Sequence, residues 1–322
     1  MLILDEEYLR HHVSMEDMLQ AMEEAFHLQA SGDFWLPDRL SYPQAKGTFV
    51  MMPCFSQKYY STKLLGTFPD NIRLGKPSIN GIMVLYHAQT GEVAALLNAA
   101  YLTGLRTGAL GGLSAKYLAA EDCESLALLG AGTQGLFQTW AAAAVRPVRD
   151  VYVYDPYSES LASFASRLHQ YRPDLRVHPM NSAAEAAKAG RLIITCTTSA
   201  TPVIPDEPSL FAGKHVIAMG SYEPAKRELP PAVLKSAAAV YVDTLFAREE
   251  SGDLAIPIAE GWQDPNAIEE FCHLVRQGGA MPELQEQTTL FKCVGMGLFD
   301  LYIAQKIYEL ACASGEGVEL SL

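Results

Sequence analysis

Residues 125–135 read Ser125-Leu-Ala-Leu-Leu-Gly130-Ala-Gly132-Thr-Gln-Gly135, and this stretch decides the fold. A short apolar run leads directly into glycines spaced as GxGxxG, and a helical pattern follows from Gln134 to Val145. A strand, a glycine-rich turn and a helix in this order form the dinucleotide-binding turn of a Rossmann domain. The first glycine permits the tight turn, the second lets the backbone approach a pyrophosphate, and the third allows the helix to pack closely on the strand. The helix N-terminus offers unpaired N–H groups to the phosphates.

An acid at the end of the next apolar run supports this interpretation. Asp155 lies 20 positions after Gly135. A carboxylate there accepts hydrogen bonds from the ribose hydroxyls and repels the 2′-phosphate of NADP. Pro156, Tyr157 and Ser158 follow, so no arginine stands immediately beside the acid in the sequence. The spacing favours NAD over NADP, and a glycine-rich turn beside an unrelated surface aspartate is the alternative.

The segment from about residue 122 to 285 alternates short runs of Val, Ile and Leu with helical stretches. The runs are 125–130, 150–155, 176–179, 192–197, 215–220 and 239–243. Continuous apolar strands separated by helices predict a parallel sheet that is covered on both faces.

The remaining segments predict a second domain of mixed α+β type. Helical patterns cover residues 6–30, with Ser14 as a candidate N-cap, and also 101–120 and 289–313. Strand patterns cover 48–52, 59–67, 81–86 and 93–98, with a turn at Gly91. The expected class is therefore α/β: a Rossmann-type parallel-sheet domain at 122–285, plus an α+β substrate-binding and dimerisation domain made of 1–121 and 286–322.

The composition limits the function classes. The 322 residues carry a net charge of −13 with a pI near 5.1, which disfavours nucleic acids and anionic membranes as partners. No apolar stretch is long enough to span a membrane, and the N-terminus lacks a signal-peptide pattern. The six cysteines are scattered and form no CxxC pair, so we expect free thiols, a cytoplasmic location and no metal site.

Several blocks resemble the ornithine cyclodeaminase/μ-crystallin family over about residues 30–311. They are 62–71 (TKLLGTFPDN), 102–109 (LTGLRTGA), 130–135 (GAGTQG), 194–199 (ITCTTS), 224–229 (PAKREL) and 291–295 (FKCVG). Members of this family act on the carbon–nitrogen bonds of amino acids and cyclic imines. The resemblance implies a homodimer built through the first domain, a substrate held in the cleft between domains, and a C-terminal helix that returns to the first domain.

The resemblance also places three cations around the carboxylate of the substrate, at Arg39, Lys63 and Arg106. An arginine can grip a carboxylate through two parallel hydrogen bonds, and a lysine adds a movable point charge. Lys63 could also donate a proton to an imine. Without the resemblance, each would be interpreted as a solvated surface cation.

The chain departs from the cyclodeaminases at two positions where they carry acids, which are Val50 and Tyr222 here. Ornithine cyclisation needs groups that handle amines, and carboxylates suit that work. The departures therefore favour reduction of an imine. Tyr222 joins Lys63 and Arg106 in the expected catalytic set, as a hydroxyl donor near the reacting nitrogen; a ring that shields the cleft is the alternative.

Weaker candidates include Thr197, Thr198 and Ser199, which follow the end of a predicted strand, where ligands bind in such sheets; the alternative is that they cap the next element. Lys292 either approaches the cofactor or substrate or lies on a helix surface, and Asp300 is interpreted as an ordinary acid on a helix face, with a functional role as the alternative. The full expected cofactor-binding set is Gly130, Gly132, Thr133, Gln134, Gly135, Asp155, Thr107, Thr197, Thr198, Gly220 and Ser221.

These observations predict an NAD(P)H-dependent oxidoreductase acting on a small amino acid or imino acid, such as pyrroline-2-carboxylate. Two alternatives remain open. One is an ornithine cyclodeaminase that recycles NAD while forming proline and ammonia, and the other is a non-catalytic dinucleotide- or ligand-binding protein similar to μ-crystallin.

Overall fold

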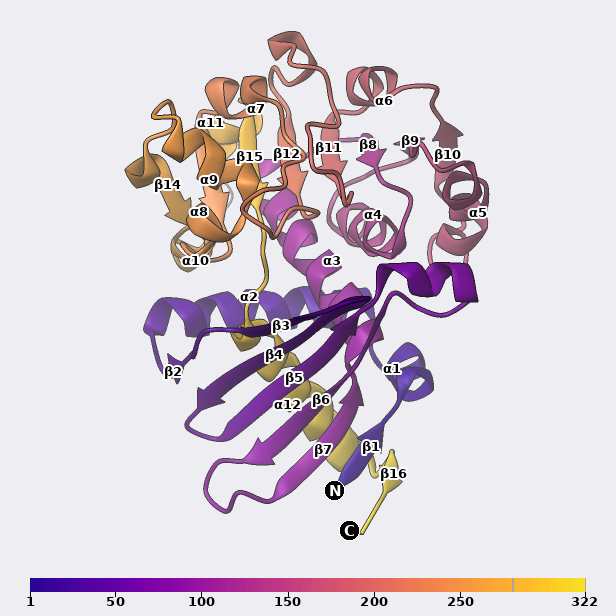
Figure 1. The fold of residues 1–322 in the computed structure, drawn as a ribbon, viewed down its shortest axis with the longest axis vertical. Coiled ribbons are helices and arrows are strands. Elements are labelled where there is room, and N and C mark those ends of the chain that lie inside the picture. The colour runs from indigo at the N-terminus through magenta and orange to yellow at the C-terminus, as the bar shows by residue number, and fades with distance from the viewer. Residues whose placement is uncertain (280, 322) are drawn as a thin grey trace. The chain divides into compact units, whose positions relative to one another are not determined.

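The computed structural model describes residues 1–279 and 281–321, and the chain divides into two compact units. Unit 1 consists of Met1–Arg106 and Met296–Leu322, and unit 2 of Thr107–Gly295 (Figure 1). The C-terminal helix therefore belongs with the N-terminal segment, as the resemblance implied.

Unit 2 is built on a parallel sheet of eight strands in the order β10-β9-β8-β11-β12-β15-β13-β14. Every neighbouring pair in this sheet is parallel, which confirms the predicted Rossmann-type architecture. The strands are β8 (Ser125–Leu129), β9 (Asp150–Tyr154), β10 (Arg176–Pro179), β11 (Leu192–Thr195), β12 (His215–Ala218), β13 (Ala239–Val242), β14 (Ile268–Glu270) and β15 (Thr289–Lys292).

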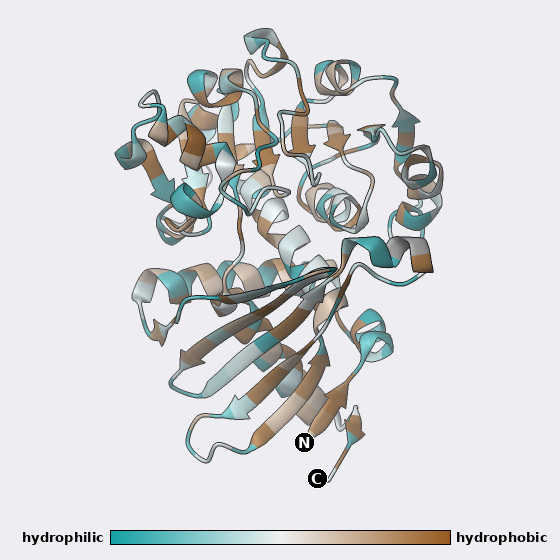
Figure 2. Cartoon of the chain, viewed as in Figure 1, coloured by the Kyte–Doolittle hydropathy of each residue, from teal (hydrophilic) through white to brown (hydrophobic). Residues whose placement is uncertain are grey.

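The helices of unit 2 cover this sheet, whose central strands β8, β11 and β12 are mostly apolar (Figure 2) and buried at every position except Ser125, which is half-buried. Alternate strand residues such as Ala127, Ile193 and Val216 join one buried cluster with residues of α6 and α7. The helices are α4 (Thr133–Val145), α5 (Ser158–Leu168), α6 (Ala183–Ala189), α7 (Pro231–Ser236), α8 (Ala247–Glu250), α9 (Gly252–Ala259), α10 (Phe271–Arg276) and α11 (Pro282–Gln285), with 3₁₀ turns at Pro208–Leu210 and Pro265–Ala267.

The long helix α3 (Ala99–Leu118) crosses the boundary between the units, which falls at Arg106 and Thr107. Its second half packs on unit 2 so closely that a Cβ added to Gly108 would lie 2.7 Å from the carbonyl oxygen of Phe137 in α4. The chain passes from one unit to the other at 106/107 and at 295/296. The sequence analysis placed these boundaries at 121/122 and 285/286, because a helical pattern does not show which domain a helix packs against.

Unit 1 is built on a second sheet, in the order β16-β1-β7-β6-β5-β4-β2, with β3 also paired to β4. Helix α12 (Gly297–Ser314) packs on its central strands, and α2 packs on α12. The other elements are β1 (Leu2–Leu4), α1 (Glu6–His12), α2 (Met15–Ser31), β2 (Phe34–Trp35), β3 (Leu40–Gln44), β4 (Gly47–Ser56), β5 (Tyr59–Thr67), a 3₁₀ helix (Pro69–Leu74), β6 (Ile79–His87), β7 (Val93–Asn98) and β16 (Val318–Glu319).

Two predicted helices were wrong in extent. The pattern at 6–30 is two helices, because Ser14 caps α2: its side chain accepts from the N–H of Asp17, and the Asp17 carboxylate accepts from the N–H of Ser14. The pattern at 289–313 begins as strand β15, whose four residues are all buried between β12 and β13. A short buried apolar run fits either a helix or a strand, and its pairing with neighbouring strands makes this one a strand. Among the described residues, no helix combines the length and the apolar character needed to cross a membrane.

Candidate cofactor and substrate sites

The glycine-rich turn of unit 2 connects β8 to α4 and has the geometry that the motif predicts. Gly130 has a φ of +103°, and a Cβ added there would lie 2.6 Å from the carbonyl oxygen of Cys196. A Cβ on Gly135 would lie 2.2 Å from the carbonyl oxygen of Gly130. A Cβ on Gly132, by contrast, would meet nothing within 4 Å, and this residue is exposed at the N-cap of α4. The turn therefore leaves bare backbone open at the helix N-terminus, which fits a pyrophosphate.

Asp155 lies directly beside this turn, just after β9. Its carboxylate accepts hydrogen bonds from the N–H of Ala131, at 2.7 Å, and from the N–H of Tyr157, at 2.8 Å. Arg167 of α5 donates to the carbonyl oxygen of Ala131 at 2.5 Å and lies within electrostatic reach of Asp155. The fold thus brings Arg167 to the glycine-rich turn, although no arginine stands beside Asp155 in the sequence.

The ends of the neighbouring strands β11 and β12 are tied together by one buried acid, Glu228. Its carboxylate accepts from the N–H of Thr197 at 2.5 Å, from the N–H of Gly220 at 2.6 Å, and from the hydroxyl of Thr195 at 3.0 Å. Ser221 is buried, and its hydroxyl donates to the carbonyl oxygen of Lys226. The polar groups predicted to contact a cofactor here are therefore held in place by the protein itself.

Behind Glu228 lies a buried ion pair. The Asp253 carboxylate accepts from the N–H groups of Glu228 and Leu229 at 2.7 and 2.9 Å, and its other oxygen lies 3.0 Å from Nζ of Lys292. Glu228, Asp253 and Lys292 are at most 1% exposed. Burial raises the pKa of Glu228, and the charge of Lys292 acts in the opposite direction. Lys292 is thus a buried residue at the end of β15, and the alternative of a helix-surface lysine was wrong.

Unit 1 holds a second buried cluster, formed by Lys63 on β5, Arg106 on α3 and Asp300 on α12. Nζ of Lys63 lies 2.6 Å from one oxygen of Asp300, and Nε of Arg106 donates to the other at 3.0 Å. The three side chains are 1%, 4% and 0% exposed. Nη1 of Arg106 is buried without a hydrogen-bond partner in the described part of the chain. Because an unsatisfied buried guanidinium N–H is costly, this atom fits a site that an anionic ligand completes.

The charges of this cluster shift its protonation. Burial lowers the pKa of Lys63 to about 8, the charge of Asp300 opposes that shift, and Arg106 and Arg39 lower the pKa further. Arg39, half-buried just before β3, therefore acts electrostatically on Lys63. Burial alone would raise the pKa of Asp300, but the adjacent Arg106 and Lys63 hold it below its ordinary value. The cluster combines the cations Lys63 and Arg106, with Arg39 nearby, with the single carboxylate of Asp300, and is therefore positive overall.

The other predicted residues occupy less constrained positions within unit 2. Tyr222 follows β12 in a loop and is 50% exposed. Thr107 is half-buried in α3, and its carbonyl oxygen accepts from the side chain of Gln138. Thr133 and Gln134 open α4 beside Gly132, and Thr198 is exposed after β11.

Sequence reasoning missed two acids at these sites, Glu228 and Asp253, and gave Asp300 a functional role only as the alternative. The interpretation of Asp300 as an ordinary helix-face acid was wrong, since it is fully buried between two cations. A usable signal was present, because Asp300 is flanked by Leu298, Phe299 and Leu301 in an apolar stretch. An isolated acid in such a stretch needs a partner if the helix is buried. Glu228 and Asp253 carried no comparable signal.

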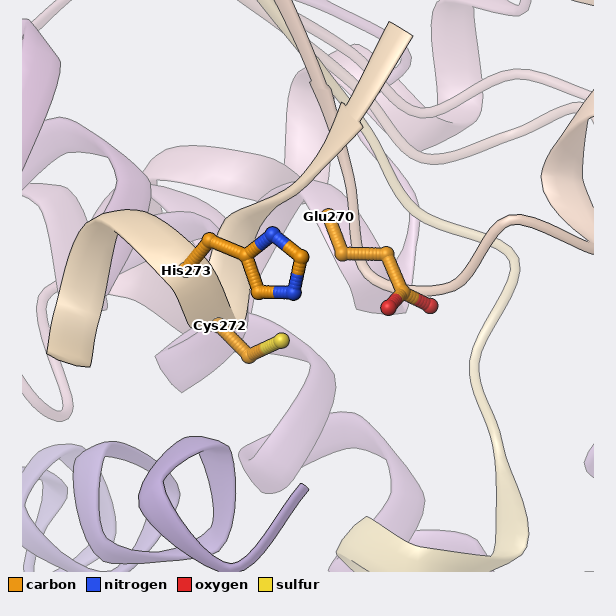
Figure 3. Close-up of side chains that lie close together, drawn as sticks. All are labelled: Glu270, Cys272 and His273. Carbon is orange, nitrogen blue, oxygen red and sulfur yellow. The ribbon is translucent and has the colours of Figure 1, made fainter. Parts of the chain in front are cut away.

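A further group of potential metal ligands lies at the edge of unit 2. Figure 3 shows the side chains of Glu270, Cys272 and His273 close together, and their ligand atoms lie within 4.8 Å of one another. Burial raises the pKa of the Cys272 thiol to about 11, and the Glu270 carboxylate accepts from the N–H of Leu245. A thiol must lose its proton to bind a metal. We therefore assign no metal to this group, and the absence of a metal from the protein stays a prediction.

Comparisons with known proteins show which proteins this chain is similar to. The model of the ornithine cyclodeaminase/μ-crystallin family matches residues 2–315. A Δ1-pyrroline-2-carboxylate reductase of Bacillus thuringiensis subsp. konkukian is 34% identical over 324 residues, which cover 98% of each chain. The structure of Thermococcus litoralis Δ1-pyrroline-2-carboxylate reductase with NADH and L-proline superposes with a TM-score of 0.93 at 29% identity, covering 99% of this chain and 100% of that one. An archaeal alanine dehydrogenase dimer with bound NAD superposes with a TM-score of 0.90 at 28% identity, covering 100% and 99%.

Proposed function

The chain belongs to the ornithine cyclodeaminase/μ-crystallin family, and we propose that it reduces a cyclic imino acid of the Δ1-pyrroline-2-carboxylate class with NADH. It is an oxidoreductase of the carbon–nitrogen bond of small amino or imino acids. The observation that carries the specific proposal is Nη1 of Arg106, which has no hydrogen-bond partner among the described residues and is buried beside Lys63 in a cluster with excess positive charge.

The carboxylate of the substrate is the group that this cluster fits. Nε of Arg106 is committed to Asp300, so the guanidinium is fixed in orientation while Nη1 remains available to an anion. Lys63 supplies a second charge, and its pKa near 8 lets it give up a proton close to neutral pH. Arg106 and Lys63 would hold the carboxylate, and Lys63 would also be the proton source for the imine nitrogen.

The cofactor would be held by unit 2, where the open backbone at Gly132 receives the pyrophosphate and Asp155 the adenosine ribose. A bound nicotinamide dinucleotide supplies the hydride chemistry, and the protein supplies orientation and charge. The carboxylate of Asp155 supports NAD over NADP, while Arg167 is committed to the carbonyl oxygen of Ala131. Asp155→Ala should narrow the preference for NADH, measured as the ratio of kcat/KM values; a wild-type enzyme that prefers NADPH would contradict the assignment.

Reduction fits better than ornithine cyclisation because Val50 and Tyr222 stand where the cyclodeaminases carry acids. Tyr222 remains a candidate hydroxyl donor to the reacting nitrogen. For this role, Tyr222→Phe should lower kcat more than it raises KM for the imino acid, whereas a shielding ring would tolerate the change.

The test is the oxidation of NADH, followed by absorbance, with Δ1-pyrroline-2-carboxylate, Δ1-piperideine-2-carboxylate, and pyruvate plus ammonia. We expect turnover with a cyclic imine and a loss of about 100-fold or more in kcat/KM for Arg106→Ala, since a buried charge-assisted contact with the carboxylate is removed. Arg10→Ala, which removes an exposed arginine on α1, is the matched control.

Each alternative predicts a different result. Proline and ammonia formed from ornithine without net change in NADH would establish the cyclodeaminase instead. Tight NADH binding without turnover of any imino acid would establish a binding protein. Wild-type kinetics in Arg106→Ala would refute the substrate site.

We further propose a homodimer formed through the face of the unit 1 sheet that α12 leaves uncovered. Large apolar side chains on this face are 38–51% exposed: Leu40, Tyr42, Phe49, Met51 and Ile82. Exposed apolar patches of this kind mark association surfaces. Ile82→Lys should convert the dimer to a monomer in light scattering, while Leu310→Lys on α12 should not; a monomeric wild-type protein would contradict the proposal.

A further inference from the structure

The loops at the carboxyl ends of β11 and β12 depend on a single side chain, Glu228. Its two oxygens hold the N–H of Thr197 after β11 and the N–H of Gly220 after β12. The fit is tight, because a Cβ added to Gly220 would lie 2.0 Å from the carbonyl oxygen of Thr197 and 2.6 Å from the Glu228 carboxylate. The glycine-rich turn is adjacent, since a Cβ on Gly130 would touch the carbonyl oxygen of Cys196. Glu228 thus sits beneath the edge of the sheet where ligands of this fold bind.

Glu228 is itself fixed from behind. Asp253 binds the backbone N–H groups of Glu228 and Leu229, and Lys292 fixes Asp253 from the next strand, β15. Ser251, at the start of α9, donates to the hydroxyl of Ser221 at 3.0 Å. A chain of buried contacts therefore connects three strands to one carboxylate, which can move little without breaking several hydrogen bonds.

The network carries more negative than positive charge. It contains the carboxylates of Glu228 and Asp253 and only the ammonium of Lys292, all fully buried. Glu228 accepts three hydrogen bonds, and two of them come from backbone N–H groups, which cannot accept a proton. These donors and the charge of Lys292 favour the ionised carboxylate against the effect of burial, which raises its pKa. One negative charge is left over in a region of low dielectric, where its field is weakly screened.

We propose that Glu228 is a positioning residue of the cofactor site, and that its buried charge makes the site bind oxidised NAD more tightly than NADH. The oxidised nicotinamide ring carries one positive charge and the reduced ring carries none. A fixed negative charge beneath the carboxyl ends of β11 and β12, the edge where this fold binds its ligands, would therefore discriminate between the two forms. The hydrogen bonds that shape the loops would serve both forms equally.

This inference rests on the proposed cofactor but not on the proposed substrate. Reduction of an imine would transfer a hydride, which is one proton with two electrons, from a bound nicotinamide to the substrate carbon, while the nitrogen gains a proton. The ring is left with a positive charge. A buried carboxylate that stabilises this developing charge lowers the barrier in the direction of imine reduction.

The experiment measures dissociation constants for NAD, NADH and ADP-ribose by isothermal titration calorimetry, with no substrate present. The variants are Glu228→Gln, which removes the charge, and Glu228→Asp, which keeps the charge and shortens the side chain. Glu223→Gln is the matched control, because Glu223 lies on the same loop and its carboxylate pairs only at the surface, with Lys226.

In Glu228→Gln we expect NAD binding to weaken about tenfold more than NADH binding, because only the oxidised ring loses a charge interaction. Glu228→Asp should weaken both forms equally. ADP-ribose, which lacks the nicotinamide, should bind both variants as it binds the wild type, and Glu223→Gln should leave all three constants unchanged.

Equal weakening of NAD and NADH by Glu228→Gln would overturn the role of the charge. If Glu228→Gln does not fold, Glu228→Asp still tests the positioning role. Unchanged affinity of Glu228→Asp for both NAD and NADH would overturn that role. A wild-type protein that binds NAD(H) but reduces no imino acid would refute the proposed substrate alone and leave this inference standing.

Discussion

The protonation of Lys63 gives the sharpest test of the substrate site, and Asp300→Asn is the change that isolates it. Asp300 is the carboxylate that both buried cations share, and its charge holds the pKa of Lys63 up against the effect of burial. The substitution keeps the size of the side chain and an oxygen that can accept a hydrogen bond. It removes only the charge.

The distance sets the magnitude. At the observed 2.6 Å between Nζ of Lys63 and the Asp300 carboxylate, two unit charges attract by about 6 kcal/mol at an effective dielectric of about 20. That value is an upper limit, because the substituted amide still accepts a hydrogen bond. Half of it corresponds to about 2 pH units, at roughly 1.4 kcal/mol per unit. The pKa of Lys63 should therefore fall from about 8 to below neutrality.

A lysine is protonated below its pKa, so activity that needs charged Lys63 is lost as the pH rises through that value. In the wild type, log kcat/KM for the imino acid should fall above about pH 8. In Asp300→Asn the same decline should begin about 2 units lower, and activity should recover on acidification. The assay is NADH oxidation across pH 5 to 10, with folding checked by circular dichroism.

Glu24→Gln is the matched control, since it also removes an acid paired with a lysine, Lys306 of α12, but this pair is partly exposed. It should keep the wild-type profile. An alkaline decline at the same pH in Asp300→Asn and the wild type would refute the reasoning, because Asp300 would then have no influence on the ionisation that controls activity.

Gly132→Ala should fold normally, since a Cβ there meets nothing within 4 Å, but it should weaken NADH binding about tenfold because the Cβ blocks the approach of the pyrophosphate. Gly130→Ala should instead lower the melting temperature, because Gly130 has a φ of +103°. Calorimetric titration and thermal unfolding separate the two effects, and unchanged affinity in Gly132→Ala would count against the cofactor site. His215 is buried between Thr289 and Ser114, and burial lowers its pKa to about 3. The unfolded chain binds this proton below about pH 6.5 and the folded chain does not, so His215 costs stability as the pH falls from 6.5 towards 3, by up to about 1.4 kcal/mol per unit. His215→Asn should flatten the decline of the unfolding free energy over this pH range, whereas His11→Asn on α1 should not. The measurement is urea denaturation at several pH values. Equal slopes of unfolding free energy against pH in His215→Asn and the wild type would contradict the assignment.

The Rossmann architecture could be predicted from the sequence because its determinants are local. The apolar run, the glycines and the helix of residues 125–145 are contiguous. Gly130 adopts a positive φ, and Gly135 packs on the carbonyl oxygen of Gly130 within the same turn. The turn at Gly91 and the cap at Ser14 are local for the same reason, and the structure has both. The cations at Lys63 and Arg106 were identified through family resemblance, which compares whole blocks.

Tertiary structure decided the partners of those residues. Arg106 and Asp300 are 194 positions apart, and nothing within either segment indicates that they share a hydrogen bond. Thr195 ends β11, whereas Glu228 lies in the loop before α7, and only the fold brings them together. The helical pattern around Lys292 does not show that its segment pairs with two strands. Periodicity reports which face of an element is apolar, whereas a buried charge is stable only beside a counter-charge or donor that the folded chain brings to it.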